Sequence, residues 1–127
     1  MLLLDSDIVI DVLRKHPPAI AWLESAGQEE VTLPGFVLME LIQGCRNRVE
    51  QQRLEPVVGE YAIVWPTPAA CDAARIVFSQ YYLSHKLGML DAIIGQTAIA
   101  LGVPLYTFNQ KHYAVIPGLE TRQPYSK

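Results

Sequence analysis

Short apolar runs alternate along this chain with segments of helical spacing, and this alternation limits the fold more than any other feature. The first run is the leucine triplet at residues 2–4, which ends abruptly at Asp5. Similar runs cover residues 30–34, 61–66 and 103–107. Strands that alternate with helices form mainly parallel sheets with helices on both faces. We therefore predict an α/β fold, a three-layer α/β/α sandwich with a mainly parallel central sheet.

The predicted helices occupy the segments between these runs. The first begins with Ser6 or Asp7 as its cap and stops before Pro17, and the others cover residues 19–26, 35–44, 46–54, 69–86 and 90–102. Asp91 takes the capping position of the last of these helices, and Gly102 ends it. The arginine-rich segment 46–54 is expected to be an exposed helix. For residues 119–122, an edge strand and an irregular tail stay equally open.

Composition indicates one folded domain over residues 1–127. Half of the residues are apolar and 18% are charged, which excludes a disordered chain. No apolar run approaches the roughly 20 residues of a membrane span, and no export signal precedes the first predicted strand. We expect a soluble, cytoplasmic protein without a membrane partner. Cys45 and Cys71 lack metal-site spacing and are expected to be reduced thiols.

The net charge is −3 and the isoelectric point is about 5.5. These values argue against a protein that holds nucleic acid by bulk positive charge. Any role on nucleic acid therefore needs a local device, such as a bound cation.

Three carboxylates stand at boundaries between predicted elements. Asp5 follows the first strand, Glu40 is the only charge in the helix after the second strand, and Asp91 begins the helix before the fourth strand. Asn109 follows the fourth strand. Neighbouring parallel strands would bring these positions together, and a cluster of oxygen ligands suits Mg²⁺ or Mn²⁺. Without a cation, or an Arg or Lys from a partner, the carboxylates would repel one another.

The sequence resembles a PIN domain, and within that family the VapC-type toxins of toxin–antitoxin pairs. The segments that carry the resemblance are residues 4–11 (LDSDIVID), 37–41 (VLMEL), 90–94 (LDAII) with 97–98 (TA), and 105–109 (LYTFN) with 111–113 (KHY). Together they cover essentially the whole chain.

The resemblance implies a PIN-like α/β/α fold and Mg²⁺- or Mn²⁺-dependent hydrolysis of RNA, as the toxin of a type II pair. By the same resemblance, Asp5, Glu40 and Asp91 match the metal-binding acids, and Ser6 matches the small hydroxyl residue beside the first acid. Asn109 stands where many relatives carry a fourth acid, and its carbonyl could hold a metal-bound water. The family also suggests a homodimer and a cognate antitoxin whose C-terminal segment crosses the acidic groove.

A cation at this site would bind a phosphate oxygen, activate water and stabilise the charge that develops during cleavage. Cationic side chains would help an acidic protein recruit RNA, and the candidates are Arg14, Lys15, Arg46, Arg48, Lys86 and Lys111.

Other polar residues are interpreted without a chemical role. Asp7 and Asp11 are expected to be capping or surface residues. The three histidines are expected to be solvent-exposed or loosely hydrogen-bonded, with His112 placed to touch substrate. Ser6 and Thr107 are expected to orient Asp5 or Asn109 by hydrogen bonds.

Two alternatives stay open. Residues 5–9 (DSDIV) also resemble the first motif of haloacid-dehalogenase-type phosphatases, but the later acidic pair with its lysine has no counterpart. A catalytically weak PIN-like module that binds RNA or protein is the second, and Asn109 is the feature that favours it. The RNA target is not encoded in any motif that we can interpret.

Overall fold

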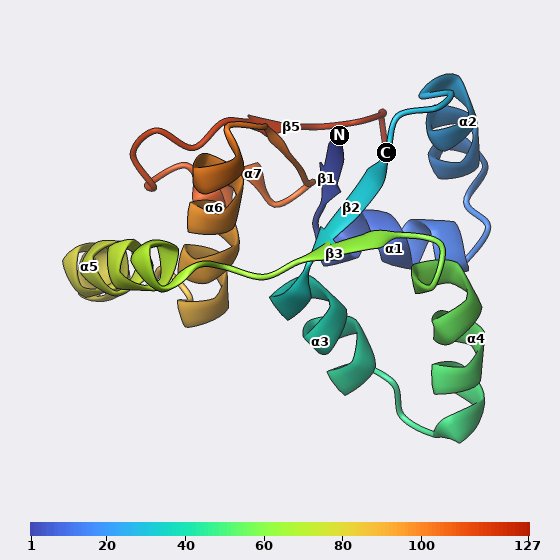
Figure 1. Cartoon of the computed structure of the whole chain (residues 1–127), viewed down its shortest axis with the longest axis horizontal. Coiled ribbons are helices and arrows are strands. Elements are labelled where there is room, and N and C mark those ends of the chain that lie inside the picture. Colours follow the sequence, from blue (N-terminus) through green and yellow to red (C-terminus); the bar gives the residue numbers. More distant parts are fainter.

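The structure is a computed structural model that describes residues 1–127. It contains five strands and seven helices (Figure 1). The strands are β1 (Leu2–Leu4), β2 (Val31–Pro34), β3 (Ala62–Val64), β4 (Leu105–Tyr106) and β5 (Thr121–Arg122). The helices are α1 (Ser6–Leu13), α2 (Pro17–Ser25), α3 (Gly35–Gln43), α4 (Arg48–Val58), α5 (Pro68–His85), α6 (Met89–Leu101) and α7 (Gln110–Tyr113).

The five strands form one parallel sheet in the order β3-β2-β1-β4-β5. Leu3 is paired with Thr32 on one side and with Leu105 on the other, so β1 is the central strand. The chain moves outward from β1 to β2 and β3, and then returns to the opposite side of β1 for β4 and β5. The connections therefore change direction between β1 and β4.

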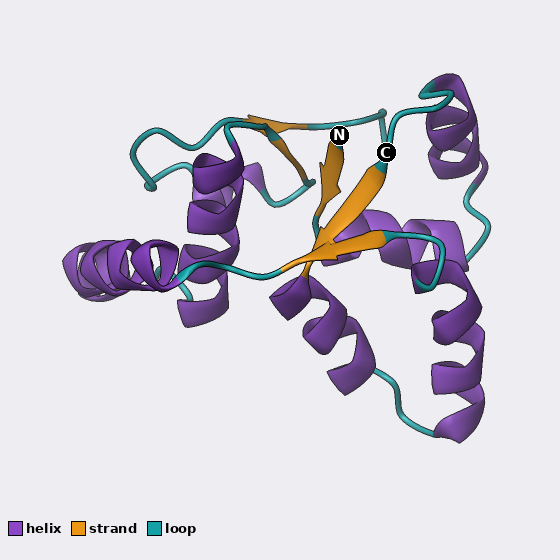
Figure 2. Ribbon diagram, in the orientation of Figure 1, coloured by secondary structure: helices purple, strands orange, loops and turns teal.

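Helices cover both faces of the sheet, as expected for right-handed connections between parallel strands. In Figures 1 and 2, α1, α2 and α4 lie to one side of the sheet and α5 and α6 to the other. Helix α3 follows β2 and contacts both α1 and α6, so it lies at the edge where the strands end. The prediction of a three-layer α/β/α sandwich is confirmed.

The core explains the all-apolar first strand. Leu3 and Leu4 are completely buried, and they share one hydrophobic cluster with Leu33, Leu105 and the buried faces of the helices. A central strand of a parallel sheet is covered on both faces, so its residues need not alternate between apolar and polar. None of the helices is both long and apolar enough to cross a membrane.

Several boundaries differ from the predictions. Gly88, and not Asp91, is the N-cap of α6, so the prediction that Asp91 caps this helix is wrong. Asn47 caps α4 through a bond from the Glu50 N–H, and that helix continues past Pro56 to residue 58. The short helix α7 was not predicted at all. Strand β5 is present and pairs with β4.

Candidate active site

The carboxyl ends of β1 and β4 form the most suitable place for a ligand in this sheet. They are neighbours, and the chain leaves them in opposite directions, which opens a crevice at the end of an α/β sheet. Asp5 directly follows β1, and the segment 107–109 directly follows β4. Helices α3 and α6 carry Glu40 and Asp91 to the same edge.

Asp5 is the most buried of these acids, with an exposed fraction of 3%. It is the N-cap of α1, and its Oδ1 accepts the Ser6 backbone N–H at 2.8 Å. Its Oδ2 accepts the hydroxyls of Thr107, at 2.9 Å, and Tyr113, at 3.1 Å. Burial raises the pKa of Asp5, and the charge of Asp91 adds to this, while the three hydrogen bonds oppose it.

Ser6 and Thr107 therefore contact Asp5 by different groups. The Ser6 contact comes from the backbone N–H, whereas Thr107 uses its hydroxyl. Thr107 also accepts the Asn109 backbone N–H at 3.0 Å. Thr107 thus links the end of β4 to the acid that follows β1.

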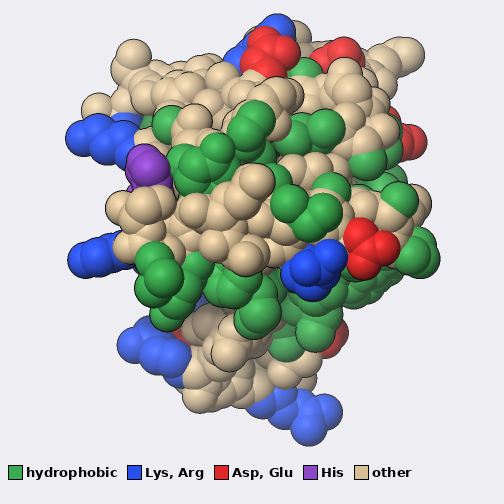
Figure 3. Space-filling model, turned by 90° about the vertical axis from the view of Figure 1, so that its left-hand side faces the viewer, with side chains coloured by type: hydrophobic (Ala, Val, Ile, Leu, Met, Phe, Trp, Pro, Cys, Tyr) green, Lys and Arg blue, Asp and Glu red, His purple; other side chains and the backbone are tan.

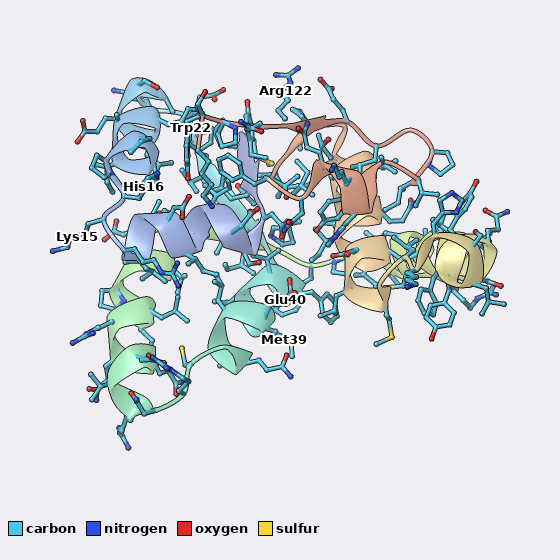
Figure 4. All side chains as sticks on the ribbon, turned by 180° about the vertical axis from the view of Figure 1, so that it is seen from behind. Lys15, His16, Trp22, Met39, Glu40 and Arg122 are labelled. Atoms are coloured by element: carbon cyan, nitrogen blue, oxygen red, sulfur yellow. The ribbon has the colours of Figure 1, made fainter.

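Glu40 lies half-buried on α3, where Figure 4 labels it, and it is near enough to the other acids for their charges to act on it. Burial and the charges of Asp5, Asp91 and Asp7 raise its pKa from 4.5 to about 7. No hydrogen bond or positive charge opposes this shift. Glu40 is therefore the carboxylate with the least compensation.

Asp91 is the third residue of α6, in its first turn. Burial raises its pKa, and the nearby charge of His112 and the Tyr113 hydroxyl lower it. His112 is exposed on α7, so an imidazole lies at the rim of the acid cluster. We refer below to Asp5, Glu40 and Asp91 as the acid cluster.

Asp7 has a larger role than the capping or surface role predicted for it. Its Oδ2 accepts the Phe108 backbone N–H at 2.8 Å and lies 3.5 Å from both the Thr107 hydroxyl and the Asn109 side-chain amide. Burial, followed by the charge of Asp5, raises its pKa. Asp7 thus fastens the start of α1 to the loop after β4.

Asn109 is exposed, and its side chain contacts Asp7 and none of the three clustered acids. The structure therefore places Asn109 at the rim of the site. Asp11, also predicted to be a capping or surface residue, is in fact buried, with 6% exposed. It accepts the Tyr125 hydroxyl at 2.6 Å and pairs with the Lys127 ammonium at 3.2 Å.

The donor set of the acid cluster fits a hard divalent cation. All three groups are carboxylates, and no Lys or Arg forms an ion pair with them. The charge of Asp91 raises the pKa of Asp5, and the charges of Asp5 and Asp91 both raise the pKa of Glu40. As the side chains stand, no group of three or more His, Cys, Asp or Glu residues is arranged to hold a metal ion. Binding at all three acids would therefore need some side-chain movement.

A groove of about 860 Å³ lies between α1, α3 and α4. Glu40 is the member of the acid cluster that lines it, and Ser6 lines it as well. Its walls are apolar along much of their length, and three cationic side chains line it as well: Arg14, Lys15 and Arg53. Figure 4 shows Lys15 at the end of α1 far from Glu40.

Only some of the cations that were predicted to recruit RNA line the groove. Arg14 and Lys15 line it, together with Arg53, which the sequence analysis did not select. Arg46 instead pairs with Glu50 at 3.0 Å. Sequence spacing could not separate these cations, because α1 and α4 meet only in the folded chain.

The fold and the site together define a class of protein, in which a parallel α/β/α sheet carries an acid cluster at its switch point. Comparison with known families agrees with this description. The PIN domain family model matches residues 2–116. The chain therefore belongs to the PIN domain family, which confirms the family prediction and disfavours the phosphatase alternative.

Individual proteins show the same relationship. Ribonuclease VapC19 of Mycobacterium tuberculosis is 33% identical over 126 residues, which cover 94% of this chain and 98% of that protein. A toxin-antitoxin complex from Klebsiella pneumoniae contains a chain that is 26% identical, with a TM-score of 0.79 and complete coverage of both chains. The DNA-bound VapBC structure from Salmonella typhimurium shares the fold, with a TM-score of 0.80 at 21% identity over 98% of this chain and 99% of that one.

Proposed function

We propose that this protein is an Mg²⁺- or Mn²⁺-dependent endoribonuclease and the toxin of a type II toxin–antitoxin pair. The observation that carries the proposal is an acid cluster that forms no ion pair with a Lys or Arg and lies at the switch point of a PIN domain. The similarity to Ribonuclease VapC19 supports RNA as the substrate.

Asp5, Glu40 and Asp91 are the residues that would hold the cation. When bound, Mg²⁺ or Mn²⁺ would neutralise the cluster and supply Lewis-acid chemistry for phosphodiester hydrolysis. The protein's own contribution is positional. Asp5 is held in place by three hydrogen bonds, and Asn109 lies at the rim, where its amide can meet the substrate.

The groove gives an acidic protein a local means of holding a polyanion. Arg14, Lys15 and Arg53 line it, and RNA phosphates that contact them would lie along a path that leads to Glu40. Binding through a few cations should weaken steeply with salt.

The direct test is cleavage of a structured RNA by purified protein with and without added metal. We expect cleavage with Mg²⁺ or Mn²⁺, its loss with excess EDTA, and its return when the metal is restored. Cleavage that continues unchanged in EDTA would contradict the metal dependence. The absence of cleavage on any RNA, together with tight RNA binding, would instead support the PIN-like binding module. The observation that favours this alternative is that the acids, as they stand, are not arranged to hold a metal ion.

We also propose that an antitoxin segment occupies the same groove. The Klebsiella pneumoniae relative was solved as a toxin-antitoxin complex. The apolar walls suit an amphipathic peptide, and an Arg or Lys near Glu40 would replace the cation electrostatically. A cognate antitoxin should therefore compete with Mn²⁺ and inhibit cleavage. An antitoxin complex that retains full Mn²⁺ affinity and activity would contradict this arrangement.

A homodimer is the oligomeric state that we propose. Apolar side chains lie exposed on α5 and at the start of α6, with Leu83 89% and Met89 62% exposed. On this side of the molecule, most charged side chains lie toward the margins (Figure 3). A second copy could cover these residues. We expect light scattering to report a dimer, and Leu83→Glu to shift it toward a monomer; a monomeric wild type would contradict the proposal.

A further inference from the structure

Tyr113 places a buried hydroxyl beside the acid cluster, a role that its position in the sequence did not indicate. The residue ends α7 and is 2% exposed, and its ring belongs to the hydrophobic core. Its hydroxyl donates to Asp5 Oδ2 at 3.1 Å and lies close enough to Asp91 to lower the pKa of that acid. A phenylalanine ring would fill the same space, so the hydroxyl requires a separate explanation.

The hydrogen bonds of Asp5 leave its two oxygens in different states. An ionised carboxylate has about four acceptor positions, two on each oxygen. Both hydroxyls, from Thr107 and Tyr113, use Oδ2, whereas Oδ1 accepts only the Ser6 N–H. Oδ2 is therefore fully occupied, and Oδ1 retains one free position.

We infer that Tyr113, acting with Thr107, is a positioning residue that holds Oδ2 of Asp5 and so presents Oδ1 alone to a divalent cation. The inference rests on the proposed function, because it concerns the same site. Groups that hydrogen-bond a metal-ligating carboxylate fix its orientation and raise metal affinity. Tyr113 suits this task because its ring is immobilised by core packing and its hydroxyl adds no charge.

The hydroxyl also interacts with two acids that the cation would share. A phenol has one proton, so it donates to one carboxylate at a time. Here that carboxylate is Asp5, and Asp91 lies near enough to the same hydroxyl for its pKa to be lowered. Without the hydroxyl, Asp5 would keep only Thr107 at Oδ2 and could rotate, so the protein would have to order this ligand when the metal binds.

The test is direct Mn²⁺ titration followed by electron paramagnetic resonance, which measures free Mn²⁺ independently of activity. Tyr113→Phe removes only the hydroxyl, and we expect the Mn²⁺ Kd to rise about 10-fold or more. Tyr82→Phe is the matched control, because Tyr82 is 53% exposed on α5, and its Kd should equal that of the wild type. If the hydroxyl served stability alone, Tyr113→Phe would lower the melting temperature of the metal-free protein without changing the Mn²⁺ Kd.

A second pair of variants keeps the test decisive if Tyr113→Phe fails to fold. Thr107→Val removes the other hydroxyl on Oδ2, and Thr107→Ser retains it, so Mn²⁺ affinity should fall clearly more in the valine variant. Unchanged or tighter Mn²⁺ binding in Tyr113→Phe, or equal affinities in the two Thr107 variants, would overturn the inference and leave the proposed function standing. A wild-type protein that binds no Mn²⁺ would overturn both.

Discussion

At the scale of single residues, the acids of this chain differ in how their charge is compensated. Asp11 is buried, yet the Tyr125 hydroxyl and the Lys127 ammonium outweigh burial and lower its pKa. Glu40 is less buried but faces only other acids, so its pKa rises to about 7. The first arrangement stabilises the folded chain by itself, whereas the second stores repulsion that a cation would relieve.

This difference predicts how the stability of the metal-free protein depends on pH. Glu40 has a raised pKa in the folded state, so between its ordinary value of 4.5 and about 7 the folded chain binds more protons than the unfolded chain. Stability should therefore fall as pH rises through this window. Urea unfolding in EDTA at pH 5 and pH 8 measures the effect.

Glu40→Gln provides the control for that prediction, because it keeps the shape of the side chain and cannot ionise. The fall in stability between pH 5 and pH 8 should be smaller in this variant than in the wild type. Equal falls in the two proteins would show that Glu40 does not carry the repulsion.

The site acids could be predicted where local sequence pattern marks them. Asp5 directly follows a strand, and Glu40 and Asp91 lie on helices next to predicted strands. The contacts of Asp7 and Tyr113 join segments about a hundred residues apart, such as the bond from the Phe108 N–H to Asp7. Local pattern carries no information about such contacts, so Asp7 was predicted only to be a capping or surface residue and Tyr113 had no predicted role of its own.

At the scale of elements, the segment after α7 is held against α6 at a glycine. A Cβ atom at Gly95 would lie 2.8 Å from Ile116 Cδ1 and 3.3 Å from Leu119 Cδ2. Gly95 therefore permits the close approach that anchors the segment following Tyr113. The C-terminal segment is held at another point, where Tyr125 packs against Phe108 and Trp22.

Gly95→Val should consequently destabilise the protein by about 1–3 kcal/mol through overpacking. Ala100→Val is the matched control, since residue 100 is exposed on the same helix and carries a comparable change in side-chain bulk. Chemical denaturation of the two variants measures the difference. A Gly95→Val protein no less stable than Ala100→Val would show that the approach to α6 is loose.

The elements themselves were largely predictable, and the exceptions have physical reasons. All four apolar runs contain strands. A strand that is covered on both faces of the sheet is apolar along its length, so it can be found in the sequence. Helix α7 has four residues, too few to show helical periodicity. Asp91 satisfied the preference for an acid near a helix start, but the first turn accepts acids as readily as the cap does, so the boundary was misplaced.

At the scale of the whole molecule, the fold creates a negative site in a protein whose stability then depends on a ligand. An ion that binds only the folded chain stabilises it by RT ln(1 + [L]/Kd), about 2.7 kcal/mol at 100 times Kd. Millimolar Mn²⁺ should therefore raise the melting temperature. Identical melting curves with Mn²⁺, Mg²⁺ and EDTA would contradict a metal site in the folded protein.

The central claim is that the acid cluster is the site of metal-dependent RNA cleavage, and Asp91→Asn tests it most directly. The substitution retains the side-chain shape and removes one charge from the cluster. Because Asp91 is not the cap of α6, no cap is lost. The substitution weakens its interactions with His112 and Tyr113 and its first-turn interaction with the helix dipole, the last of which is a cost of about 0.3–1 kcal/mol, and relief of repulsion at Asp5 and Glu40 offsets these losses.

The measurement is the rate of Mg²⁺-dependent cleavage of a structured RNA by wild type, Asp91→Asn and Asp72→Asn. Asp72 is exposed on α5 and serves as the control for loss of one negative charge. We expect Asp91→Asn to fold normally without metal and to lose about 100-fold or more in rate, because a cation held by fewer anions binds and activates poorly. Asp72→Asn should match the wild type, and equal rates in all three proteins would contradict the claim.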